Sequence, residues 1–114
     1  MRLPSRLPFA VAMEMALTGD PITAETAKEY GLVARVAPKG SAVEVAMELA
    51  ERIARNAPLA VAASKQLVRE TQGRTEAEFW ELQRSLMGSV FTSEDAKEGP
   101  RAFAEKRAPN WSGH

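Results

Sequence analysis

The sequence contains no cysteine among its 114 residues. That absence excludes a disulfide scaffold, a thiolate nucleophile and a cysteine-ligated metal, and it fits a cytoplasmic protein. Histidine is nearly absent too, because the single one is the terminal residue, His114. No second ligand lies at a useful spacing from it, so we expect no metal site and expect this end of the chain to be disordered.

An excess of charge of either sign is also missing. Fifteen Lys and Arg balance fifteen Asp and Glu, so the net charge is zero and no field favours nucleic acid or an anionic membrane. No apolar run approaches the roughly 20 residues that cross a bilayer, and no signal peptide is evident. The composition, 45% hydrophobic and 26% charged, is typical of a soluble globular protein. The length suits one small domain over residues 1–114.

Helix start and stop signals predict a mainly α chain. Thr23 and Ser93 are candidate N-caps, and Thr75 with Glu78 has the form of a capping box, as does Ser41 with Glu44. Glycines or prolines follow most of the expected ends. The six expected helices cover residues 9–18, 23–30, 41–56, 58–71, 75–91 and 93–107.

Two segments depart from this helical pattern. Residues 32–37 are short, carry two valines and end at Pro38, which favours an extended segment packed on the helices. Gly99-Pro100 interrupts the last helix, and an interior proline removes a backbone hydrogen bond at a cost of about 3 kcal/mol. We therefore expect a kink or a restart near Pro100.

Four stretches, in this order, resemble the C-terminal half of crotonase-family proteins, and enoyl-CoA hydratases most closely. The first two are contiguous and run from Ala12 to Pro38, with a Leu-Thr-Gly turn and a Gly-Leu-Val-x-x-Val-x-Pro close. The third is NAPLAVAASK, at residues 56–65, and the fourth is SEDAKEGPRAFAEKRAP, at residues 93–109. Pro100 departs from the family, which usually has an apolar residue there.

The resemblance implies the C-terminal helical assembly region of the crotonase (ClpP/crotonase-like) fold, without its N-terminal ββα spiral core. In the family, that core carries the oxyanion hole and the two glutamates that add water to a 2-enoyl-CoA. Nothing in this sequence matches them, so we expect an incomplete domain with no catalytic residue and no activity alone. Cofactors are not expected.

The resemblance also implies partners. Family members assemble into trimers, often paired into hexamers, and their last helix lies against a neighbouring subunit's CoA site. A phenylalanine and a lysine contact CoA there; Phe103 and Lys106 match them. Their spacing of three predicts one shared helix face. Acyl-CoA is expected to bind only with a complete core, and a core Phe beside a surface Lys is the alternative interpretation.

The sequence leaves two other functions open. A stand-alone helical interaction module would use the surface that meets the spiral core in the family. A helix-turn-helix nucleic-acid binder is disfavoured by the zero net charge. The glutamates in the resembling stretches are interpreted as capping or solvated residues rather than general bases. They are Glu14, Glu25, Glu29 and Glu98.

Overall fold

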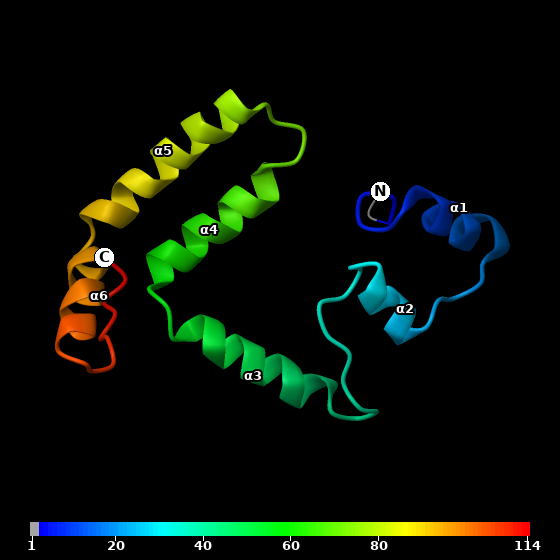
Figure 1. The fold of residues 1–114 in the computed structure, drawn as a ribbon, viewed down its shortest axis with the longest axis horizontal. Coiled ribbons are helices and arrows are strands. Elements are labelled where there is room, and N and C mark those ends of the chain that lie inside the picture. Colours follow the sequence, from blue (N-terminus) through cyan, green and yellow to red (C-terminus); the bar gives the residue numbers. More distant parts are fainter. Residues whose placement is uncertain (1–2) are drawn as a thin grey trace. The chain divides into compact units, whose positions relative to one another are not determined.

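A computed structural model describes residues 3–114. Within that range the regular structure is entirely helical, with six helices and no strand (Figure 1). The helices are α1 Phe9–Thr18, α2 Ala24–Glu29, α3 Ala42–Ala54, α4 Pro58–Glu70, α5 Glu76–Thr92 and α6 Glu94–Ala104. All six predicted helices are confirmed, and their ends differ from the predicted ones by a few residues.

Side-chain caps start three of these helices at the predicted residues. The Thr23 hydroxyl accepts a hydrogen bond from the Thr26 amide at 3.1 Å. Thr75 forms the complete capping box, accepting from the Glu78 amide while the Glu78 carboxylate accepts from the Thr75 amide at 2.7 Å. Each cap satisfies amides that have no partner inside the helix.

Thr75→Ala is expected to destabilise the second compact unit by about 1 kcal/mol, because it removes the acceptor at the start of α5. Thermal unfolding followed by circular dichroism measures the change. Thr92→Ala is the matched control, since Thr92 lies at the other end of α5 and its hydroxyl donates to carbonyls of its own helix. Equal losses in the two variants would contradict the role of the capping box.

The predicted extended segment forms no strand. Gly31 adopts a φ of 75°, and the amides of Leu32 and Val33 both donate to the Ala27 carbonyl, at 2.8 and 3.3 Å. The chain therefore folds back on the end of α2 before it continues without regular structure toward α3. A strand needs a neighbour for its main-chain groups, and the described residues provide none.

Of the kink or restart expected near Pro100, the restart does not occur, since α6 continues through this residue from Glu94 to Ala104. Proline lacks only its own amide, so the single main-chain bond lost is the one to the Ala96 carbonyl. Gly99 also helps, since the residue before a proline is pushed out of the helical region chiefly by contacts that include its Cβ, which glycine lacks.

The described chain divides into two compact units, residues up to Met47 and residues Glu48–His114. The first contains α1, α2 and the beginning of α3. In the second, α4 packs against α5 and α5 packs against α6. The segment after α6 runs back beside that helix (Figure 1).

The core of the described residues is small. Its buried apolar members are four alanines and one leucine: Leu7, Ala12, Ala27, Ala63 and Ala102. Among residues 3–114 no large side chain is fully buried, whereas Phe9, Leu17, Val68 and Phe91 are each at least 70% exposed. The apolar stripes of the helices are thus left largely open to other protein surfaces.

Candidate functional site at the C-terminal helix

The start of α6 is fixed by Ser93, which is buried at the junction with α5. Its hydroxyl accepts from the Ala96 amide at 3.1 Å and donates to the Val90 carbonyl at 2.7 Å. One side chain thereby closes the C-terminal end of α5 and caps α6, which sets the direction of the last helix.

The end of α6 is a Schellman turn. The Arg107 amide donates to the Ala102 carbonyl at 3.0 Å and the Lys106 amide donates to the Phe103 carbonyl at 3.2 Å. Lys106 occupies the position of the turn that usually holds glycine, with a φ of 53°, and no other non-glycine residue of the range 3–114 has a positive φ. A side chain in that conformation is disfavoured by about 1 kcal/mol or more.

The two predicted CoA-contacting residues lie at this turn. Phe103 is in the last turn of α6 with 85% of its surface exposed, so it is no core residue within the described chain. Lys106 is exposed and lies beyond the helix, which ends at Ala104. The prediction that both share one helix face is therefore wrong, because the chain leaves the helix before it reaches Lys106.

The segment after the turn is tied to α6 by Asp95, which is only 3% exposed. Its carboxylate accepts from the Ser112 amide at 2.7 Å, the Ser112 hydroxyl at 3.0 Å and the Gly113 amide at 3.1 Å. These donors favour the charged form and lower the pKa of Asp95 below its ordinary value.

Glu98 holds the turn from the same side of α6. Its carboxylate takes a bidentate ion pair from Arg107, with Nη1–Oε1 at 2.5 Å and Nη2–Oε2 at 3.1 Å, and also accepts from the Asn110 amide at 2.8 Å. The Arg107 guanidinium, followed by the Asn110 amide, lowers the pKa of Glu98 to about 2. Glu98 is therefore an ion-paired structural carboxylate, and not the capping or solvated residue that the sequence predicted.

The tail also reaches the corner between α3 and α4. The Trp111 indole nitrogen donates to the Arg55 carbonyl at 2.8 Å. The Trp111 ring also lies against Gly99, so that a Cβ atom added to this glycine would be 3.5 Å from the ring. The His114 carbonyl accepts from the Glu94 amide at 2.9 Å. The expectation of disorder at His114 is thus wrong, because these hydrogen bonds hold the tail in place.

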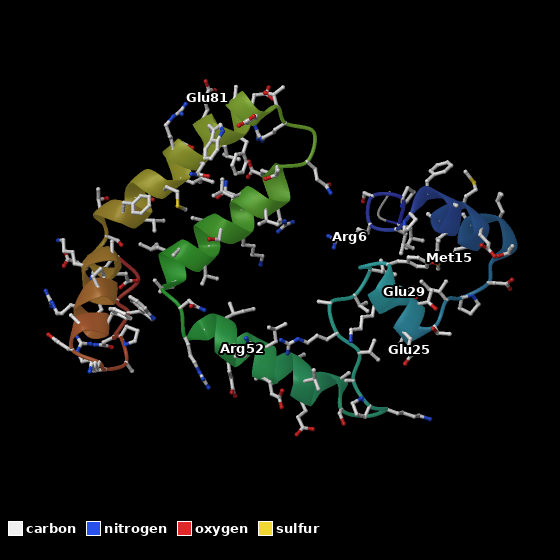
Figure 2. The ribbon with its side chains drawn as sticks, in the orientation of Figure 1. Arg6, Met15, Glu25, Glu29, Arg52 and Glu81 are labelled. Carbon is white, nitrogen blue, oxygen red and sulfur yellow. The ribbon has the colours of Figure 1, made fainter. Side chains whose placement is uncertain are left out.

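The other three glutamates singled out from the sequence are solvent-exposed, and Figure 2 shows Glu25 and Glu29 on α2. Glu25 lies in the first turn of its helix, where a carboxylate favours the helix dipole. Within residues 3–114, no group of three His, Asp or Glu side chains could hold a metal ion. No helix in that range is long and apolar enough to cross a membrane.

The network that shapes this site was not visible in the sequence. Asp95 reads as an ordinary acidic residue of a first helical turn, and its partners are 17 and 18 positions away. The pairing of Glu98 with Arg107 spans nine positions, two to three helical turns plus a reversal of the chain. A single sequence carries no signal for contacts of this kind.

Acidification is expected to weaken the second unit between about pH 4.5 and pH 2 through Glu98. The folded pKa of about 2 lies below the ordinary 4.5, so the stabilisation is complete above pH 4.5 and is lost as the pH falls toward 2. Urea unfolding of the wild type and Glu98→Gln at several pH values measures it. The difference in stability between the two should shrink through this window, and a constant difference would contradict the ion pair.

Comparison with known proteins decides the family. The family model described as Enoyl-CoA hydratase/isomerase matches residues 1–114. The chain belongs to this family. Among curated relatives of the enoyl-CoA hydratase/isomerase family, enoyl-CoA hydratase EchA19 of Mycobacterium tuberculosis is 49% identical over 97% of this chain. A carnitinyl-CoA dehydratase of Proteus mirabilis is 45% identical over 99% of it.

Solved structures of the family are similar to this chain. An enoyl-CoA hydratase from Mycobacterium tuberculosis is similar with a TM-score of 0.94 at 50% identity, covering 99% of this chain. One from Bacillus anthracis gives a TM-score of 0.92 at 36% identity. The predicted crotonase-family membership and C-terminal helical fold are thereby confirmed.

The chain spans less than half the length of these family members. It covers 42% of the Mycobacterium tuberculosis relative, 45% of the Proteus mirabilis relative and 45% of the first solved structure. The matched part is the C-terminal portion of the enoyl-CoA hydratase/isomerase chain.

Proposed function

We propose that these 114 residues form the C-terminal part of an enoyl-CoA hydratase, an enzyme that adds water to a 2-enoyl-CoA in fatty-acid or related acyl-CoA metabolism. Their part in it is to assemble subunits and to complete the CoA site, and alone they do not catalyse hydration. The observation that carries this proposal is the family match over residues 1–114. The proposal places the protein in the cytoplasm and involves no cofactor, nucleic acid or membrane.

The names of the relatives support an acyl-CoA substrate. The two curated relatives are called an enoyl-CoA hydratase and a carnitinyl-CoA dehydratase, so both names describe the gain or loss of water on a CoA thioester. The chain carries residues similar to both along 97–99% of its length.

The end of α6 supports the CoA-binding part of the proposal. Phe103 offers an exposed ring, and Lys106 lies three residues later on an exposed turn. An aromatic ring stacks on a nucleotide base, while an ammonium is a compact partner for a phosphate. A CoA molecule carries both an adenine and phosphates, so one end of this ligand fits the pair.

The proposed inactivity of the chain alone rests on the chemistry that hydration requires. Water addition to an enoyl thioester needs carboxylates poised beside a water and amides directed at the developing oxyanion. Among the described glutamates, Glu98 is committed to Arg107, and Glu14, Glu25 and Glu29 lie on exposed helix surfaces.

Two measurements test the catalytic part. The purified chain is assayed for hydration of crotonyl-CoA, first alone and then after coexpression with the N-terminal portion of a related hydratase. We expect no turnover alone and restored turnover in the complemented enzyme. Hydration by the chain alone, or failure of a folded complex to turn over, would remove this proposal.

Lys106→Ala is expected to weaken CoA binding by up to about fivefold, as for an exposed ion pair worth at most about 1 kcal/mol. Calorimetric titration of the complemented enzyme with CoA measures it, because CoA is expected to bind only when the N-terminal core is present. Lys97→Ala is the control, since it removes a cation from the same helix near its other end. Equal affinities for Lys106→Ala and the wild type would exclude a contact between Lys106 and CoA.

Self-assembly into a trimer or hexamer is the second part of the proposal. Large exposed apolar side chains along the helices, among them Leu17, Val43, Val68 and Phe91, support an association surface. Sedimentation equilibrium of the complemented enzyme gives the mass directly. A stable monomer over the micromolar range would contradict assembly.

The same exposed apolar surface favours a second candidate, a stand-alone helical interaction module. The two candidates differ in their response to the N-terminal portion of a hydratase. A module of this kind would keep its own partner and ignore the added core, whereas the proposed hydratase segment would bind it. Size-exclusion chromatography of the mixture distinguishes them.

A further inference from the structure

The backbone of Lys106 is held in a conformation that lysine disfavours. Its φ of 53° falls in the left-handed region, at the position of a Schellman turn where glycine is usual. Glycine there would close the same turn without a steric penalty. Strain of this kind is found where a side chain is needed at a fixed place, so the turn points to a function for the lysine side chain.

Glu98 closes the loop that contains this turn. Its carboxylate holds Arg107, the residue directly after Lys106, and the amide of Asn110. The side chain of Glu98 is only 14% exposed, so the ion pair is partly shielded from water. The Lys106 and Arg107 amides also donate hydrogen bonds to carbonyls at the end of α6. Together with the Glu98–Arg107 ion pair, these hydrogen bonds fix the chain on both sides of Lys106.

The two adjacent cations of the turn have different surroundings. The Arg107 guanidinium is paired with Glu98 and also with Glu105, at 2.6 Å. Lys106 is exposed and makes no ion pair with any residue of the range 3–114. Arg107 thus holds the turn in place, while Lys106 is available to bind an anion.

We propose that Glu98 is a positioning residue for Lys106: through Arg107 and the Asn110 amide, it fixes the left-handed turn from which the Lys106 ammonium meets a phosphate of CoA. This inference rests on the proposed contact between Lys106 and CoA. According to this inference, the Glu98 carboxylate strengthens the binding of the CoA phosphate, although the negative charge of Glu98 repels that phosphate.

That opposition of sign gives the test. Glu98→Gln removes a negative charge near the phosphate, so simple electrostatics predicts tighter CoA binding, whereas loss of positioning predicts weaker binding. We expect a loss of about two- to fivefold, the range for a displaced exposed ion pair. The measurement is calorimetric titration of the complemented enzyme, with its N-terminal portion present, with CoA. Unchanged or tighter binding would overturn the proposal.

A double-mutant cycle separates positioning from general destabilisation. Because Glu98 acts through Lys106, Glu98→Gln should have no further effect on CoA affinity in a Lys106→Ala chain. A full additional loss in that background would instead show a role independent of Lys106. Glu94→Gln is the matched control, since it breaks a Glu–Lys pair on the same helix away from the turn and should leave affinity no weaker than in the wild type.

Amide hydrogen exchange tests the positioning without any ligand. Glu98→Gln should accelerate exchange at the Lys106 and Arg107 amides, which donate within the turn, while the Ala27 amide in the first unit stays unchanged. If Lys106→Ala leaves CoA affinity unchanged, the proposed contact between Lys106 and CoA is wrong. The exchange result then still shows whether Glu98 fixes the turn that contains Lys106. Unchanged exchange at both turn amides would overturn the positioning role.

Discussion

Asp95→Ala is expected to release residues 112–113 from α6 and to expose the Ser112 and Gly113 amides to solvent. The buried carboxylate is the acceptor for both amides and for the Ser112 hydroxyl, so one substitution removes three hydrogen bonds and leaves both amides without a partner. Removing a buried acceptor that two main-chain amides share is destabilising, because the fold then loses both hydrogen bonds at once. Hydrogen exchange should show the two amides exchanging at the rate of an unstructured peptide.

The matched control is Asp20→Ala, because Asp20 is an exposed aspartate of the first unit. It should leave the exchange of the tail amides as in the wild type. Asp95→Asn should give an intermediate result, since an amide side chain keeps one acceptor oxygen but loses the charge. Full protection of Ser112 in Asp95→Ala would show that the tail docks by other contacts.

Pro100→Ala is expected to stabilise the second unit by up to about 3 kcal/mol, the difference in helix propensity between the two residues. The alanine supplies an amide to the Ala96 carbonyl and removes the ring from the interior of α6. Pro100 is exposed, so no buried contact is lost. Urea denaturation with constant slope measures the change.

Pro21→Ala is the control for that experiment, because Pro21 lies in the irregular segment between α1 and α2. Removing a proline there regains no helical hydrogen bond and adds freedom to the unfolded chain, so stability should fall slightly. If both variants were less stable than the wild type, Pro100 would have to contribute contacts that outweigh its missing amide.

The sequence by itself determined which segments are helical and where several of the helices begin. The pair Thr75 and Glu78 caps the start of α5, and Ser93 caps the start of α6, through hydrogen bonds made within three residues. Gly19 ends α1 with a φ of 77°. Such signals are local, since a cap depends on residues one turn away. The resemblance of four ordered stretches was sufficient for the family as well.

Only the tertiary structure decided how the C-terminal site is built. The sequence placed Phe103 and Lys106 on one helix face, whereas the Schellman turn ends α6 before Lys106 and sets its backbone in the left-handed region. Glu98 and Asp95 received their partners when the chain reversed direction after Ala104. Contacts made across such a reversal depend on the path of the chain in space, which the spacing of residues does not encode.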